Sequence, residues 1–302
     1  MGAVRLAHKQ GSGMRSIRCT RSVLFGLQLI LALVWLPSLP VSAEQVPASS
    51  VEFPVWSRSW VGTLGSKQVE VELNRTADGL SGSYCYQPCR AETRRQLVLN
   101  GRIRGEGAAL TERDSGDGAA ETGTWRIKSF ENVITGTWIS PNGERTLPLA
   151  LSQIQDDLKA RFPYEIRLLA DALPEEEGDG CPTPPLVSAI RLYKDGALIQ
   201  TLETESQGTC SVFTPDLIDA NFDGWPDLRL AMFLPAGPNI PSQYWLYDPT
   251  TGRFIDAPEG LQGISSAMFD QVHQVVYSYW RASCCEHGVS TYRWTDGDVE
   301  EI

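Results

Sequence analysis

The clearest pattern in the first half of the chain is the alternation of apolar and polar side chains over short segments. Val69-Glu70-Val71-Glu72-Leu73 places its valines and leucine on one face and its glutamates on the other, as a half-buried strand does. Leu97-Val98-Leu99 is followed by the turn signal Asn100-Gly101 and then by Arg102-Ile103-Arg104. Short strands that recur at intervals of roughly 8–12 residues predict an antiparallel sandwich or barrel over residues 51–153.

A three-residue motif recurs in this half, and it consists of a glycine, a serine or threonine, and a large aromatic residue. The copies are Gly82-Ser83-Tyr84, Gly123-Thr124-Trp125 and Gly136-Thr137-Trp138. We expect each glycine to lie in a turn and each aromatic ring to lie in the core. Residues 105–123 are rich in glycine, aspartate and glutamate, and this composition predicts a hairpin loop.

The second half, residues 160–302, has the same short-strand character. Val187–Tyr193 and Ala197–Leu202 flank the hairpin turn Lys194-Asp195-Gly196. Further strands are expected at Leu228–Leu234, Tyr244–Tyr247, Arg253–Ile255, Val272–Arg281 and Val289–Thr295. We expect a short helix within 153–162 and a loop over the acidic, proline-rich residues 171–185. The predicted fold class is therefore all-β, with a C-terminal meander of hairpins, because the sequence carries no long helical period.

One stretch of the second half has a demanding arrangement of oxygen ligands. In the segment D-A-N-F-D-G-W-P-D, which runs from Asp219 to Asp227, side-chain oxygens stand at positions 1, 3, 5 and 9, and a glycine stands at position 6. Oxygen ligands at this spacing are typical of calcium loops. Position 12 is Leu230 instead of the glutamate of an EF-hand, and the residues around it indicate a strand. The alternative is an Asx-rich turn without a metal.

We therefore predict a structural Ca²⁺ site in this loop, since its near ligands all come from one segment. The predicted ligands are the side chains of Asp219, Asn221, Asp223 and Asp227 and the backbone carbonyl of Trp225. Calcium is favoured over magnesium because side-chain and backbone oxygens in a flexible loop suit the larger ion.

Residues 1–43 have the features of a secretory signal peptide. Three arginines precede an apolar run over residues 23–36, and small residues follow up to Ala43. The run is shorter than the roughly 20 residues that span a bilayer, and the only cysteine of the leader, Cys19, precedes the run. We therefore expect cleavage near Ala43 and a soluble, periplasmic product that is neither a lipoprotein nor inserted in the membrane.

The charge of the chain narrows its possible partners. The sequence has 26 Lys and Arg against 37 Asp and Glu, and five of the basic residues lie in 1–43, so removal of the leader changes the net charge from −11 to −16. A surface this acidic repels nucleic acid and anionic lipid and attracts cations and basic proteins. We therefore expect no nucleic-acid partner.

Six cysteines follow the leader, and an even number in an exported chain predicts disulfides. By proximity in the sequence the pairs are Cys85–Cys89, Cys181–Cys210 and a vicinal Cys284–Cys285, although six cysteines allow other pairings. The vicinal bond would stiffen the loop around it. A zinc site is the weaker interpretation, because no second close pair has the required spacing and only His273 and His287 follow the leader.

The sequence gives little support for an enzyme. It has no G-x-S-x-G, no H-E-x-x-H, no P-loop and no G-x-G-x-x-G after a strand, and the two histidines that follow the leader offer few general bases. His287 beside the vicinal cysteines suggests a thiol nucleophile, but a disulfide fits an oxidising compartment better. Trp56, Trp60 and Tyr244-Trp245 have rings that stack on sugars in lectins, although aromatic residues in strands are more often part of the core.

Several stretches resemble a family of bacterial periplasmic proteins. Residues 217–228, L-I-D-A-N-F-D-G-W-P-D-L, are similar to its hallmark D-x-N-F-D-G-Y-x-D-L. Tyr244-Trp245-Leu246-Tyr247-Asp248-Pro249, Gly252-Arg253-Phe254 and the closing Tyr292-Arg293-Trp294 are similar to later parts of its pattern. The resemblance covers about 160–302 and is weaker over 51–153, which looks like an added β-domain.

This family includes calcium-binding immunity proteins that inhibit lysozyme-like, peptidoglycan-cleaving toxins, and its members resemble an incomplete β-propeller. The resemblance therefore implies a calcium-stabilised inhibitor that binds a lysozyme-like cell-wall hydrolase, with an incomplete propeller over 160–302. The residues of the inhibitory surface do not carry over from the family pattern. The alternative is an exported, calcium-dependent module that binds glycan or envelope without inhibiting an enzyme.

Overall fold

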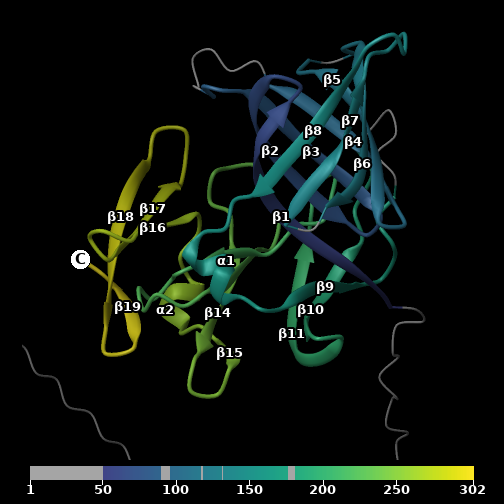
Figure 1. Cartoon of the computed structure of the whole chain (residues 1–302). Coiled ribbons are helices and arrows are strands. Elements are labelled where there is room, and N and C mark those ends of the chain that lie inside the picture. The colour runs from purple at the N-terminus through teal and green to yellow at the C-terminus, as the bar shows by residue number, and fades with distance from the viewer. Residues whose placement is uncertain (1–49, 90–95, 117, 131, 176–180) are drawn as a thin grey trace, which may run out of the picture. The chain divides into compact units, whose positions relative to one another are not determined.

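The structure of the protein is a computed structural model that describes residues 50–89, 96–116, 118–130, 132–175 and 181–302. The expected leader, 1–43, lies outside these residues. The described chain is nearly all β, as predicted, and has two short helices (Figure 1). None of the helices within the described ranges is long and apolar enough to cross a bilayer.

Eight antiparallel strands form a closed barrel, which decides between the two architectures expected for residues 51–153. They are β1 (Val51–Leu64), β2 (Lys67–Thr76), β3 (Gly79–Tyr86), β4 (Leu97–Arg104), β5 (Gly107–Asp114), β6 (Glu121–Phe130), β7 (Val133–Ile139) and β8 (Thr146–Gln153). Each strand pairs with the next, and Trp60–Leu64 of β1 pairs with Leu149–Gln153 of β8 to close the ring. The alternation in β2 is confirmed, because Val69, Val71 and Leu73 are buried between exposed Glu70 and Glu72.

The prediction of a loop over residues 105–123 was wrong, because most of this segment is strand β5 and the start of β6. Ala108, Leu110 and Glu112 alternate inward along β5. Glu112 is one of the acidic residues that suggested a loop, but it is only 3% exposed. Its carboxylate is satisfied inside the barrel, where it accepts hydrogen bonds from Tyr84 Oη, Thr122 Oγ1 and Trp125 Nε1 at 2.7–2.8 Å.

The glycines of the recurring motif also differ from expectation, because they lie inside strands and not in turns. A side chain at Gly82 would meet the carbonyl oxygen of Glu72 on β2 at 2.0 Å, and one at Gly136 would meet that of Arg126 on β6 at 2.3 Å. Glycine therefore allows neighbouring backbones to approach closely where the barrel curves. The aromatic residues do belong to the core: Tyr84 and Trp125 are buried, and Trp138 packs partly buried against the barrel core.

The rest of the chain forms three sets of four antiparallel strands. The first consists of the start of β1 with β9 (Glu165–Ala170), β10 (Leu186–Lys194) and β11 (Ala197–Gln207). The second is β12 (Asp216–Ile218), β13 (Asp227–Ala231), β14 (Ser242–Asp248) and β15 (Arg253–Asp256). The third is β16 (Ala267–Asp270), β17 (Val275–Arg281), β18 (His287–Thr295) and β19 (Asp298–Glu301). The second and third sets are four-stranded meanders of consecutive strands, as the expected C-terminal meander of hairpins requires, whereas the first set borrows β1 from the barrel.

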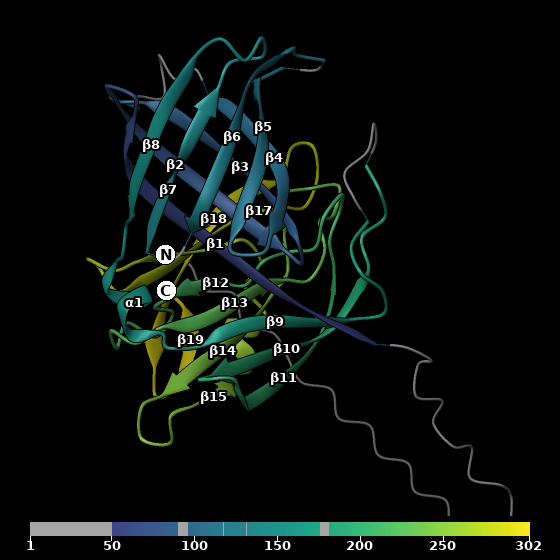
Figure 2. The same ribbon diagram turned by 45° about the vertical axis from the view of Figure 1, so that its right-hand side comes forward.

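Strand β1 belongs to both parts of this architecture. Val51–Pro54 pairs with Arg167–Ala170 of β9, while Val55–Leu64 pairs with β2 in the barrel. Figure 2 shows this strand leaving the barrel and lying beside β9. Its side chains accordingly enter two hydrophobic cores, because Phe53 and Val55 pack with β9 and β10, whereas Trp60 and Leu64 fill the barrel.

The connections follow ordinary turn and capping chemistry. Helix α1 (Asp157–Arg161) falls within the expected segment, and the Asp156 side chain accepts the Lys159 N–H at 2.7 Å as its N-cap. The second helix is α2 (Glu259–Gln262). Asp195 and Gly196 both have positive φ, as the two-residue hairpin turn predicted between β10 and β11 requires.

Candidate metal centre

The aspartate loop connects β12 to β13, and its backbone is folded tightly. Phe222 and Gly224 have φ values of 63° and 82°, so the chain twice enters the left-handed region. Asp227 is the first residue of β13, which confirms that a strand follows the loop. Because Ile218 pairs with Asp227, the ends of the loop are fixed by the β12–β13 ladder.

The carboxylates of the loop accept hydrogen bonds from the backbone of the loop itself. Asp219 accepts the N–H groups of Asp223 and Gly224, each at 3.0 Å through a different oxygen. Asp223 accepts the N–H of Trp225 at 2.8 Å, and the Asn221 side-chain amide donates to Asp223 at 2.9 Å. These contacts orient Asp219, Asn221 and Asp223 around the same turn.

Asp227 is the most deeply buried of the loop's carboxylates, with no exposed surface. One oxygen accepts the N–H of Ala220 and the other accepts the N–H of Tyr247 on β14, both at 2.8 Å. Burial raises the pKa of Asp227 to about 7; its two backbone hydrogen bonds oppose the shift, and the charges of Asp223 and Asp219 add to it. Burial also raises the pKa of Asp219, against hydrogen bonds from the loop backbone.

Residues from distant segments hold the loop in place. Gln271, between β16 and β17, donates to the Asp219 carbonyl at 2.8 Å, and Trp294 Nε1 on β18 donates to the Ala220 carbonyl at 2.8 Å. Arg161 of α1 donates to the Gly224 carbonyl at 2.6 Å, and its guanidinium lies 5.7 Å from the centre of the Trp225 ring. The loop thus joins the β12–β15 and β16–β19 sheets. These anchors follow no sequence spacing, so the sequence analysis missed them.

The donor set fits a hard divalent cation such as Ca²⁺, because it offers carboxylate, amide and carbonyl oxygens. The carboxylates have not converged on one point, however. Within the described ranges, the one group of three acidic, cysteine or histidine side chains with ligand atoms within 4.8 Å of one another is Glu70 with Cys85 and Cys89. That group is no metal site, since the two cysteines are bonded to each other. Coordination by the loop would require its side chains to turn further inward.

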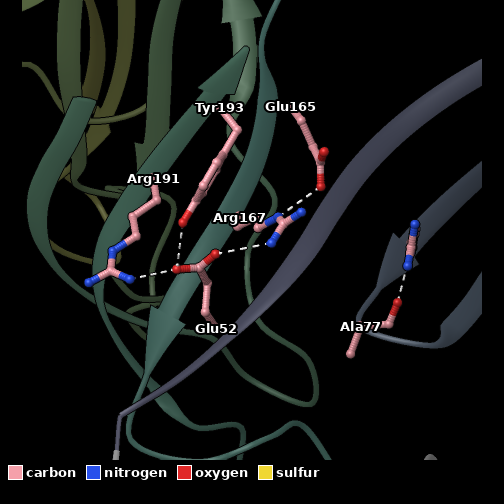
Figure 3. A network of polar contacts seen from close by, with 7 residues as sticks. Glu52, Ala77, Glu165, Arg167, Arg191 and Tyr193 are labelled. Carbon is pink, nitrogen blue, oxygen red and sulfur yellow. Dashed lines mark hydrogen bonds and ion pairs between the residues drawn. The ribbon is translucent and has the colours of Figure 1, made fainter. Parts of the chain in front are cut away.

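A second charged cluster, absent from the sequence analysis, surrounds Glu52 on β1. Figure 3 shows its carboxylate facing Arg191 and Tyr193 of β10 and Arg167 of β9. Arg191 donates at 2.6 Å, the Tyr193 hydroxyl at 3.1 Å and Arg167 at 3.4 Å. Arg167 also pairs with Glu165 at 2.8 Å and lies 4.6 Å from the centre of the Tyr193 ring.

The predicted cysteine pairs are confirmed in two of three cases. Cys85–Cys89 and Cys181–Cys210 are disulfides. The third prediction is corrected, because Cys284 and Cys285 are exposed free thiols whose sulfurs lie 3.1 Å apart, a contact distance and not a covalent bond. Two disulfides indicate a chain that folds in an oxidising compartment.

The aromatic residues considered for sugar stacking are mostly part of the core. Trp60 and Tyr244 have no exposed surface, Trp245 is 1% exposed, and Trp56 packs partly buried against the barrel core. A buried ring has no face to offer a sugar. Comparisons with protein-family models, curated proteins and solved structures found no match to this chain.

Proposed function

We propose that this protein is an exported, calcium-stabilised inhibitor that binds and blocks a lysozyme-like cell-wall hydrolase. The observation that carries the proposal is the aspartate loop. Its sequence resembles the hallmark of an inhibitor family, and in the structure its carboxylates surround one turn that ties two sheets together. The all-β architecture, with successive four-stranded meanders, supports the same assignment.

The part assigned to calcium is structural. A bound Ca²⁺ ion supplies the positive charge that the buried carboxylates lack. The residues that would hold it are Asp219, Asn221, Asp223 and Asp227 through their side chains and Trp225 through its carbonyl, once the side chains turn inward. Gln271 and Trp294 of the β16–β19 part of the chain donate hydrogen bonds to backbone carbonyls of the same loop. Ordering the loop therefore also stabilises that sheet.

Inhibition in this proposal involves no chemistry by the protein, which occupies the substrate cleft of the hydrolase and excludes the peptidoglycan strand. The net charge of −16 after leader removal steers the protein toward basic hydrolases. The leader and the two disulfides support a periplasmic location. The same negative charge disfavours nucleic acid and anionic membrane as partners.

The test is a cell-wall turbidity assay. Residues 44–302 are titrated against a panel of lysozyme-like hydrolases in calcium-containing buffer, and we expect stoichiometric loss of lysis for at least one of them. The matched control is Asp223→Ala in excess chelator, which lacks the ion but keeps the rest of the surface, and it should inhibit less at the same concentration. Full lysis with every hydrolase, by folded protein in calcium, would reject the inhibitor assignment.

The second candidate function is a glycan- or envelope-binding module, and one observation favours it. The outer face of the barrel has a shallow depression across β2, β3 and β4, lined chiefly by amides and hydroxyls. Its polar side chains are Glu72, Asn74, Ser81, Ser83, Gln96 and Asn100. Such groups hydrogen-bond to sugar hydroxyls. Calorimetric titration with soluble peptidoglycan fragments tests it: the wild type should bind, and Asn74→Ala with Asn100→Ala should not.

A further inference from the structure

The two free thiols lie at the tip of the hairpin between β17 and β18. This tip is closed by its own backbone, because the N–H groups of Ala282 and Ser283 donate to the Glu286 carbonyl at 2.9 and 3.2 Å. The Ser283 hydroxyl accepts the N–H groups of Cys285 and Glu286 at 3.3 and 3.1 Å. The loop therefore presents Cys284 and Cys285 to solvent, and neither thiol serves as a core residue.

This placement differs from that of the other described cysteines, which are all in disulfides. Two exposed sulfurs 3.1 Å apart are accessible and already in contact. The hydrogen bond with Cys284 raises the pKa of Cys285, which lowers the fraction of its thiolate at neutral pH. The case for exchange rests on the geometry, because both thiols are accessible and each has a neighbouring thiol that can resolve a mixed disulfide.

We propose that Cys284 and Cys285 form a reversible thiol–disulfide couple that exchanges with disulfide-bearing molecules. In the oxidising direction, a thiolate of the pair attacks one sulfur of the incoming disulfide, forms a mixed disulfide and releases the other sulfur as a thiol. The second thiolate then attacks the bonded sulfur of its neighbour, closes the vicinal bond and releases the second thiol. Two electrons pass to the incoming disulfide, and the two protons of the pair end on the released thiols.

The two thiols lie between β17 and β18, next to an exposed part of the β16–β19 sheet. Tyr279 and Val289 are directly opposite each other on β17 and β18, and they are 39% and 61% exposed. Closing the vicinal bond changes the backbone of the loop that joins these two strands. The oxidation state of the pair therefore alters the surface that this hairpin offers, whether or not the protein inhibits a hydrolase.

The experiment equilibrates the folded protein with buffers of graded reduced-to-oxidised glutathione ratio and then blocks free thiols with N-ethylmaleimide. Peptide mapping of the mature chain, residues 44–302, follows each cysteine-containing peptide separately. We expect the peptide with Cys284 and Cys285 to pass from two labels to none, with a mass lower by two hydrogens than the unlabelled dithiol. Peptides with the other two pairs should stay unlabelled across the series.

The single variants Cys284→Ser and Cys285→Ser are matched controls, because the residues are exposed and serine preserves their size. Each should take one label in reducing buffer and carry a stable glutathione adduct in oxidising buffer. Three results would overturn the proposal: two labels on the wild type in every buffer, a persistent glutathione adduct on the wild type, or a vicinal bond that resists reduction until the protein unfolds.

Discussion

Glu52 and Asp227 are both carboxylates in a sheet, yet they differ in how deeply they are buried and in the charge of their neighbours. Burial alone would raise the pKa of Glu52, but hydrogen bonds from Arg191, Tyr193 and Arg167 and the Arg191 charge outweigh it, and the net shift is downward. Burial raises the pKa of Asp227, whose hydrogen-bond donors are two backbone N–H groups and whose charged neighbours, Asp223 and Asp219, raise it further. Where the chain supplies arginines, the charged carboxylate is stable without help from outside.

The aspartate loop lacks this internal compensation. None of the ion pairs found among the described residues involves Asp219, Asp223 or Asp227. Arg161 touches the loop, but its guanidinium donates to the Gly224 carbonyl and lies over the Trp225 ring. This difference is the physical reason for proposing an external cation at the loop and none at Glu52.

The largest effect is expected from Asp227→Ala. The substitution leaves the N–H groups of Ala220 and Tyr247 without their acceptor, and each buried unsatisfied donor costs about 1–3 kcal/mol. We expect a large fall in the free energy of unfolding, measured by urea denaturation, and loss of any response to calcium. Asp256→Ala, at an exposed aspartate on β15, is the control and should change little. A variant as stable as the control would show that Asp227 does not organise the loop.

Calcium itself should give the next largest effect. An ion that binds only the folded state stabilises it by about 2.7 kcal/mol at a hundredfold excess over its dissociation constant. We expect the melting temperature to be higher in millimolar calcium than in excess chelator, and Asp223→Ala to reduce the difference. Equal melting temperatures in the two buffers would show that the loop, like the Glu52 cluster, is stable without a bound cation.

A smaller effect is expected from Gln271→Ala, which removes the hydrogen bond to the Asp219 carbonyl but no ligand. The typical net worth of such a bond is about 0.5–1.5 kcal/mol. Calorimetric titration should show a modest loss of calcium affinity, because the loop is held less firmly before binding. An unchanged affinity, together with lower stability, would limit Gln271 to a role in sheet packing.

The smallest effect is expected from Arg191→Met, because the pair with Glu52 is partly exposed and such pairs contribute about 1 kcal/mol or less. The pKa of Glu52 is lowered, so its contribution is present above its ordinary value of 4.5 and is lost as pH falls through the folded value. The stability difference between wild type and variant should therefore shrink in acid. If the stability difference between wild type and Arg191→Met changed with calcium, the Glu52 cluster and the aspartate loop would not be independent sites.

Local chemistry explains what the sequence predicted correctly. The alternation in β2, the Asp195-Gly196 turn and the Cys85–Cys89 pair each depend on residues close together in the chain. The Cys181–Cys210 pair spans 29 residues and was predicted because few cysteines follow the leader. Glu112 was misjudged because a buried carboxylate is identified only by its partners, and Tyr84 lies 28 residues away. The anchors of the aspartate loop were not predicted for the same reason, since Gln271 and Trp294 are 52 and 74 residues from the carbonyls they bind.

The sharing of β1 between the barrel and β9 has a consequence for cooperativity. One uninterrupted backbone places Phe53 in one hydrophobic core and Trp60 in the other. Denaturant that opens the barrel therefore withdraws the strand that covers the edge of β9, and both cores are expected to melt in a single transition. A C-terminal fragment that begins at residue 160 lacks β1, so the edge of β9 is left unpaired. We expect this fragment to aggregate through that edge where the intact protein does not.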